Sequence, residues 1–145
     1  MNRKYICLVC IFLSFCISCN SKELKGFGNP KIGKIVQIAR VTILSEYNGD
    51  LIYPKYKIEL TVKEKYNIVS LHLRTNYIFG QDLNFISSKN INLNTNELDI
   101  LNKERKYSLI IELEPIQKEV IRHEFSIGKL NEERISNAFI YIKYK

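Results

Sequence analysis

Hydrophobic and polar residues alternate with a period of two along much of the chain. In residues 56–62 every second side chain is apolar, and the positions between hold Lys57, Glu59 and Thr61. This alternation is typical of a β-strand with one buried face, because successive side chains point to opposite sides of a strand. The same alternation predicts further strands in residues 69–73, 109–113, 121–127 and 138–144.

A β-hairpin is predicted near the start of this region. Asn48-Gly49 lies between residues 35–46 and an apolar run that begins near Ile52. An Asn-Gly pair favours a tight turn, because such a turn needs positive φ angles that these residues tolerate. A helix remains an alternative for the first segment, because its apolar residues also fit one helical face: they are Ile32, Ile35, Val36, Ala39 and Ile43.

Two segments lack the alternation. Residues 87–97 are rich in Asn and predict a loop or an irregular edge, and residues 129–136 predict one helical turn. The pattern contains no long helix. We therefore predict the all-β class, with an antiparallel β-sandwich of about seven or eight short strands.

One short segment indicates which class of β-sandwich to expect. Leu101 and Tyr107 are separated by Asn-Lys-Glu-Arg-Lys, and Tyr107 opens the predicted strand YSLIIEL. This spacing is similar to the tyrosine corner of immunoglobulin-like and fibronectin type III-like domains, in which the phenol hydroxyl bonds to an upstream backbone group. The resemblance implies an Ig-like sandwich. A transthyretin-like sandwich remains open, because it would have the same strand pattern.

The first residues have the layout of a secretory signal peptide. Arg3 and Lys4 precede an uncharged and mostly apolar stretch at residues 5–17. A helix of this length would extend roughly 20 Å, which is shorter than the ~30 Å hydrocarbon core of a membrane. We therefore expect a cleaved signal rather than a permanent membrane span.

The signal ends in Phe15-Cys16-Ile17-Ser18-Cys19, which resembles the lipobox of bacterial lipoproteins. Cys16 departs from that pattern, because Leu is commonest at its position. The resemblance implies cleavage before Cys19, a diacylglyceryl group on its sulfur, and acylation of its amine by a fatty acid such as palmitate. An ordinary secretory signal with small apolar cysteines is the alternative.

Lipidation would anchor the mature protein. Each buried methylene contributes about 0.8 kcal/mol, so two or three acyl chains hold a protein firmly on a bilayer. Asn20 follows Cys19, at the position where an Asp is linked to inner-membrane retention. The expected location is therefore the outer membrane of a bacterial cell envelope.

These features divide the chain into three parts. Residues 1–18 are the expected signal peptide, residues 19–34 hold the lipidated Cys19 and a flexible tether, and residues 35–145 form one sandwich domain. The tether has three glycines and one proline, as flexible linkers do. Its lysines outnumber Glu23, so it either contacts anionic headgroups or stays solvated. No cysteine follows Cys19, which excludes a disulfide or thiolate metal site in the later residues.

Few residues suggest catalysis or metal binding. His72 and His123 fall on separate predicted strands, with His72 expected on the surface and His123 in the core. Glu112 and Glu114 share one strand face at a separation of roughly 7 Å, which glycoside hydrolysis could use, but any solvent-facing strand has this pattern. We therefore predict no catalytic residue, no metal and no cofactor.

The charge of the chain is moderate. Its formal net charge is +7, and removal of Arg3 and Lys4 leaves about +5. Basic residues alternate with acidic ones along the predicted strands, and an exported protein does not normally meet nucleic acid. Nucleic acid is therefore not an expected partner.

The residues expected to bind a protein partner lie near the C-terminus. Phe139, Tyr141 and Lys143 alternate with Ile140 and Ile142. If the two isoleucines point inward, the other three residues form an apolar strip with a cationic edge, as protein contacts often have. The alternative is that another segment covers this face.

We therefore expect a non-catalytic envelope lipoprotein that binds membrane lipid through acylated Cys19 and an envelope protein through its sandwich. It would act as a binding or assembly module. An inhibitor or immunity lipoprotein against an envelope hydrolase or toxin is one alternative. A small envelope enzyme using Glu112, Glu114 or His123 is another.

Overall fold

The computed structural model describes residues 20–27, 29–79, 85–117 and 133–145. Strands make up most of these residues, together with one α-helix and one 3-10 helix, so the predicted all-β class is confirmed. No helix within these ranges is long and apolar enough to cross a bilayer. The expected signal peptide, Cys19, the strand at residues 121–127 and His123 lie outside the described residues.

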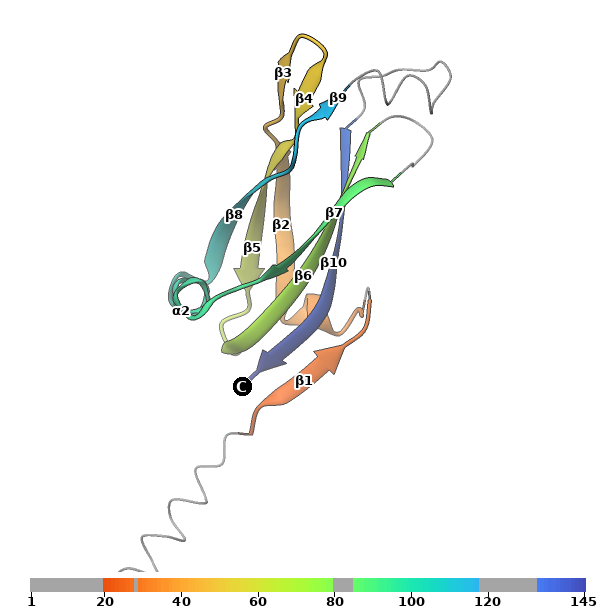
Figure 1. The fold of residues 1–145 in the computed structure, drawn as a ribbon. Helices are drawn as coiled ribbons and strands as arrows, with labels where there is room; N and C mark the ends of the chain where they lie inside the picture. Colours follow the sequence, from red (N-terminus) through yellow and green to blue (C-terminus); the bar gives the residue numbers. More distant parts are fainter. Residues whose placement is uncertain (1–19, 28, 80–84, 118–132) are drawn as a thin grey trace, which may run out of the picture.

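Two antiparallel sheets form the layers of the sandwich (Figure 1). The four-stranded sheet has the order β1 (Lys22–Lys25), β10 (Glu133–Tyr144), β6 (Ile68–Phe79) and β7 (Phe85–Asn92). The central three-stranded sheet has the order β2 (Val36–Ile43), β5 (Lys55–Val62) and β8 (Lys106–Glu112). The chain crosses between the layers from β1 to β2 and from β5 to β6, as a sandwich requires.

A third sheet extends from one end of the sandwich, and we call it the arm. It contains β3 (Glu46–Asn48), β4 (Leu51–Tyr53) and β9 (Ile116–Gln117). Asn48 pairs with Leu51, and Gly49 in the turn between them has a φ of 58°. The hairpin predicted from Asn48-Gly49 is therefore confirmed. β2 and β5 continue this pairing in the same register, since Ile43 pairs with Tyr56, so residues 35–46 pair with the run from Ile52 as expected.

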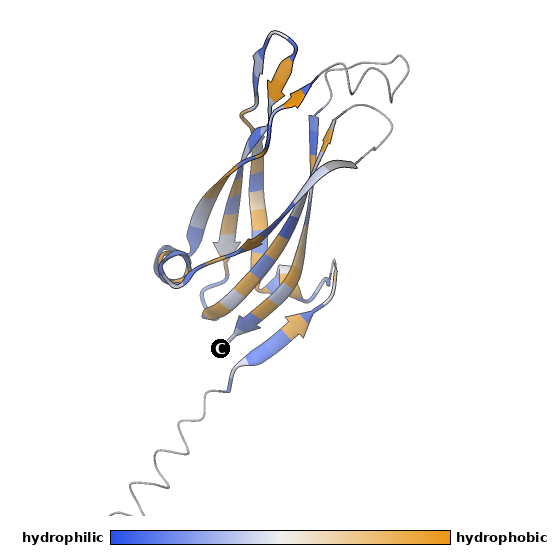
Figure 2. Ribbon diagram, viewed as in Figure 1, coloured by the Kyte–Doolittle hydropathy of each residue, from blue (hydrophilic) through white to orange (hydrophobic). Residues whose placement is uncertain are grey.

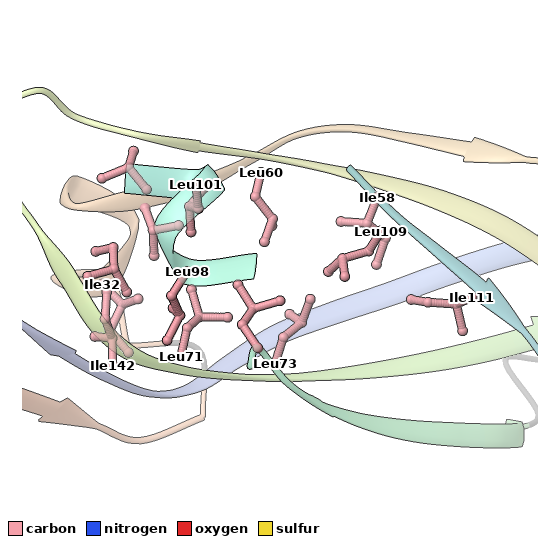
Figure 3. Close-up of a cluster of buried hydrophobic side chains, with 14 of the residues drawn as sticks. Ile32, Ile58, Leu60, Leu71, Leu73, Leu98, Leu101, Leu109, Ile111 and Ile142 are labelled. Atoms are coloured by element: carbon pink, nitrogen blue, oxygen red, sulfur yellow. The ribbon is translucent and has the colours of Figure 1, made fainter. Parts of the chain in front are cut away.

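The core lies between the two layers and follows the alternation of the sequence. Along β5, buried side chains alternate with partly exposed ones, and Figure 2 shows the same alternation of hydropathy along the strands. Figure 3 shows Ile58 and Leu60 from the central sheet and Leu71 and Leu73 from β6 within one cluster of buried hydrophobic side chains. Each fully buried side chain of this size stabilises the fold by about 1.5–3 kcal/mol.

A polar pair joins the layers inside this core. The Tyr56 hydroxyl on β5 lies 2.5 Å from Oγ1 of Thr75 on β6, and neither residue exposes any surface. Burial raises the pKa of Tyr56. Buried hydroxyls need a hydrogen-bond partner to offset the loss of water, so this pair favours one alignment of the two sheets.

Helix α2 (Thr95–Glu104) connects the layers and corrects one prediction. Residues 87–97 were expected to be a loop or an irregular edge. Residues 87–92 belong to β7, which lies at the sheet edge and has one register shift, but the helix starts at Thr95 within the same segment. Asn94 and Glu97 form a capping box at the helix start, and Leu98 and Leu101 bury one face. An Asn followed three residues later by Glu is a local start signal for a helix.

The expected tyrosine corner has a different partner. The Tyr107 hydroxyl donates to Glu97 Oε1 at 3.2 Å, rather than to a backbone group. The connection between Leu101 and Tyr107 is the end of α2, which closes with Arg105 in the left-handed region at a φ of 59°. The helix therefore supplies the acceptor that a backbone loop supplies in a tyrosine corner.

The segment expected to be a flexible tether is part of the fold. β1 pairs with β10 over four residues, and Leu24 packs against the core. The 3-10 helix η1 (Ile32–Lys34) buries Ile32 completely before β2 begins at Val36. The alternative helix thus covers three residues only. The folded domain begins near residue 22 instead of 35, because Lys22–Lys25 pair with β10 and Ile32 is buried.

Two further expectations change on β6 and β10, one of them through a β-bulge. Ser70 pairs with Lys143, whereas Ile68 pairs with Tyr144, so Val69 is an extra residue. The alternation in residues 69–73 predicted that Val69 is buried, but Ile68 is buried instead and Val69 is 37% exposed. Residues 133–136 belong to β10, so the predicted helical turn is wrong there, and residues 129–132 lie outside the described residues.

Candidate binding surface

β10 carries the three residues predicted to bind a partner, and a bulge redirects one of them. Phe139 pairs with Leu73, but Tyr141 pairs with His72, so Ile140 is an extra residue. Leu73 is fully buried, and Phe139 packs against the core. The expectation that Phe139 shares an outward strip with Tyr141 and Lys143 is wrong, because a bulge shifts the alternation by one residue.

Tyr141 and Lys143 stay together, and β1 provides their contacts. The Tyr141 hydroxyl donates to Glu23 Oε1 at 3.2 Å, and Lys143 Nζ lies 3.8 Å from the same oxygen. Lys25 Nζ lies 5.5 Å from the centre of the Tyr141 ring. The hydrogen bond from Tyr141 and the two lysine charges hold the pKa of Glu23 below its usual value. These contacts fasten β1 to β10 rather than forming an open apolar strip.

A surface pocket of about 200 Å³ lies where the central sheet meets the arm. The Leu113 N–H donates to the Pro54 carbonyl at 3.0 Å, which joins the chain after β8 to the link between β4 and β5. The pocket therefore lies at the bend between the two sheets. Its lining residues are Glu46, Tyr53, Pro54, Lys55, Glu112 and Leu113.

An ion pair forms the polar part of this pocket. Lys55 Nζ lies 2.6 Å from Glu112 Oε1. Their hydrogen bond and opposite charges raise the pKa of Lys55 and lower the pKa of Glu112, so both groups are charged at neutral pH. Lys89 Nζ, from β7 in the opposite layer, donates to the Glu112 carbonyl at 3.3 Å. A contact from the opposite layer therefore fixes the backbone of Glu112 beside the ion pair.

Exposed hydrophobic side chains flank the ion pair. Ile110 lies two residues before Glu112 on the same face of β8 and is 61% exposed. Tyr53 is 39% exposed. Leu44 is exposed too, and it lies beside Lys55 because its N–H donates to the Lys55 carbonyl at 2.7 Å. We call these five residues the arm-side surface: Leu44, Tyr53, Lys55, Ile110 and Glu112. Apolar contact area beside a few fixed polar groups is typical of binding sites.

Glu133 holds the arm against the four-stranded sheet. The Ser45 hydroxyl donates to Glu133 Oε2 at 2.5 Å, and the Tyr47 hydroxyl donates to Oε1. The Ser45 Oγ also accepts from the Lys55 N–H at 3.1 Å. Burial, together with the Glu133 carboxylate, raises the pKa of Tyr47 and keeps its phenol protonated. These bonds connect the start of β10 to the chain beside the pocket.

The residues considered for chemistry are not brought together. His72 lies between Tyr141 and Asn92 in the outer four-stranded sheet, and His123 lies outside the described residues. Glu112 is paired with Lys55, and Glu114 follows the end of β8. Within the described ranges, no group of three His, Cys, Asp or Glu side chains is placed to hold a metal ion.

The arm-side surface was missed by reasoning from the sequence alone. The alternation along β8 places Ile110 on an outer face, but nothing local indicates that Tyr53 and Lys55 meet the end of that strand. The Asn48-Gly49 turn was the available signal, because it brings Glu46 opposite Tyr53. Comparisons with protein-family models, with curated proteins and with solved structures find no match for this chain.

Proposed function

We propose that this chain is a lipoprotein of a bacterial cell envelope, anchored by acylated Cys19, and that its folded part binds another envelope protein through the arm-side surface. One observation carries the proposal. β1 begins at Lys22, at one end of the sandwich, while the arm extends from the opposite end (Figure 1). A protein held by Cys19 would therefore present the arm-side surface away from its bilayer.

The chemistry of the arm-side surface suits a protein partner. Ile110 and Tyr53 offer apolar contact area, and aromatic residues are enriched in the most important positions of protein interfaces. Lys55 and Glu112 neutralise each other, and each retains atoms that can bond to a polar partner. The bonds from Lys89 and Glu133 order this region before binding, which lowers the entropic cost of association.

Site-specific cross-linking in cells tests the surface. A photoreactive phenylalanine analogue replaces Ile110, and the matched control places it at Arg74, which is exposed on β6 of the other sheet. We expect one envelope protein to be cross-linked from position 110 and not from position 74. A subunit of a secretion machine would indicate an assembly module, and a hydrolase or toxin would indicate an inhibitor or immunity protein. Equal products from both positions would contradict this proposal.

A substitution measures the strength of the contact. Ile110→Asp places a charge in the apolar part of the arm-side surface while leaving the buried core intact. If Ile110 is a central contact, affinity for the identified partner should fall by about 2 kcal/mol, which is roughly 30-fold. Arg74→Asp, at the control position, should leave affinity unchanged. Titration of the purified pair by calorimetry compares the two variants.

The anchor is tested separately. Mass spectrometry of the natural mature protein should find its first residue to be Cys19 with acyl chains attached. Cys19→Ser should move the protein from the detergent-rich phase to the aqueous phase in a partition assay, because two or three acyl chains are lost. Cys16→Leu, which introduces the residue commonest in lipoboxes, should remain in the detergent phase. Detergent partitioning of Cys19→Ser equal to that of the wild type argues against lipidation.

A further inference from the structure

We propose that the end of the sandwich where β1 begins is a second interaction surface, which binds anionic phospholipid headgroups. This inference rests on the proposed anchor at Cys19 and adds that the folded domain itself contacts the bilayer. The surface comprises the start of β1, the turn at residues 63–67 and the end of β10. We call it the basic end.

The chain leaves little distance between the anchor and the basic end. Only Asn20 and Ser21 separate Cys19 from β1. At about 3.5 Å per extended residue, Lys22 lies within roughly 10 Å of the anchored residue. This distance is close to the Debye length of ~8 Å at physiological ionic strength, so charges at the basic end interact with a charged bilayer. Because β1 is paired with β10, its residues belong to the folded domain and do not lengthen the linker to the anchor.

Backbone hydrogen bonds bring several chain segments together at this end. The N–H and carbonyl groups of Asn67 bond to those of Lys145 at 3.0 and 2.9 Å. The Lys63 N–H donates to the Ile35 carbonyl at 3.0 Å, and Lys22 pairs with Tyr144. The turn, the start of β2 and both ends of the chain's folded part therefore meet opposite the arm (Figure 1).

Positive charge predominates on these segments. Glu64 is an exposed carboxylate in the turn, while Glu23 on β1 already bonds to Tyr141 and lies near two lysines. A lysine close to an anionic membrane surface favours contact by about fivefold. The exposed lysines of these segments are Lys22, Lys63, Lys65 and Lys145.

A pair of tyrosines adds to this chemistry. The Tyr66 and Tyr144 rings meet edge to face with their centres 5.4 Å apart, and Lys65 Nζ lies 5.0 Å from the centre of the Tyr66 ring. Tyrosine is enriched at the headgroup level of membranes, because one end of the ring is apolar and the other is polar. Lysines around tyrosines fit an anionic headgroup layer better than the internally paired charges of the arm-side surface.

A single-label experiment on the lipidated protein tests the basic end. No cysteine follows Cys19, and an acylated Cys19 has no thiol, so Asn67→Cys provides one labelling site in the turn. A fluorophore at this site is compared in vesicles of phosphatidylethanolamine and phosphatidylglycerol and in vesicles of phosphatidylcholine, both with a headgroup-attached quencher. We expect strong quenching in the anionic vesicles and weak quenching in the zwitterionic ones.

Matched charge variants identify the contact. Lys63→Gln with Lys65→Gln should shift the contact equilibrium about 25-fold toward release, at about fivefold for each lysine. Arg40→Gln with Arg74→Gln removes the same charge from exposed positions on β2 and β6 and should preserve the quenching. Equal quenching in both kinds of vesicle, or an equal loss in both double variants, overturns this inference.

Different results would refute the proposed anchor and the proposed basic end. Labelling of a free thiol at Cys19, or a mature mass without acyl chains, would overturn the proposed anchor and this inference with it. An acylated protein whose turn is not quenched by anionic vesicles would overturn the basic end only and leave the proposed lipoprotein intact.

Discussion

The buried hydrogen bond between Tyr56 and Thr75 allows a quantitative test of how the two layers are joined. Their hydroxyl oxygens lie 2.5 Å apart, and both residues are fully buried. Tyr56→Phe and Thr75→Val each remove one hydroxyl and nearly preserve the shape of the side chain. A double-mutant cycle of these two changes isolates the energy of the pair from the effects of each substitution alone.

The structure predicts the sign and the size of the coupling. Each single variant should be less stable by about 1–3 kcal/mol, because it leaves a buried hydroxyl without its short hydrogen bond. In Tyr56→Phe, the Thr75 hydroxyl retains a long contact of 3.5 Å to the Lys89 carbonyl. The double variant replaces both partners with apolar groups and should be close to the wild type in stability. The coupling energy is therefore expected to equal the sum of the two single losses, about 2–6 kcal/mol.

Urea unfolding followed by far-ultraviolet circular dichroism measures the four stabilities. The slope of the free energy of unfolding with urea should be the same in all variants, so that shifts of the midpoint report stability. Tyr53→Phe is the control, because it removes the same oxygen from an exposed ring and should change stability by less than about 0.5 kcal/mol. Additive losses in the double variant would refute this account of how the layers are joined.

Three further predictions concern stability. Ile32→Ala should destabilise the protein by about 2–5 kcal/mol, because Ile32 is fully buried; an unchanged urea midpoint would restore the tether interpretation. Asn94→Ala should lower the free energy of unfolding by about 1 kcal/mol, because the capping box with Glu97 is lost. Asn94→Asp should retain most of that stability in the same urea assay. Burial and the charge of Glu133 raise the pKa of Tyr77 above the value of about 10 that it has in the unfolded chain. The contribution of this phenol to stability is therefore complete below about pH 10 and is lost as the pH rises further, because the unfolded chain then ionises first. Stability measured from neutral to alkaline pH should therefore fall less steeply in Tyr77→Phe than in the wild type.

The strands of the central sheet could be predicted because their burial is one-sided. β5 alternates buried and partly exposed residues along its whole length, and this pattern is visible in the sequence. α2 also had local signals in Asn94 and Glu97, which were overlooked within an Asn-rich stretch. β1 had no such signal, because Leu24 is the only apolar residue among its four and its pairing partner lies at the other end of the chain.

The candidate sites were harder to predict than the strands. Phe139 lies on the inner face because of the extra residue Ile140, and no local pattern marks that position as a bulge. The pocket brings Tyr53 and Lys55 to Glu112, which follows them by more than fifty positions in the sequence. Both features depend on which strands pair and in which register, so alternation within one strand does not determine them.

The sequence by itself determined the all-β class, the Gly49 hairpin and the alternating face of β5, since these follow from the conformations and solvation of neighbouring residues. Only the tertiary structure decided that β1 and η1 belong to the fold, that Phe139 points inward and that an ion pair lies in the pocket beside the arm. The physical reason is that strand pairing and bulge positions depend on the hydrogen bonds and the burial of several strands together. No single segment contains that information.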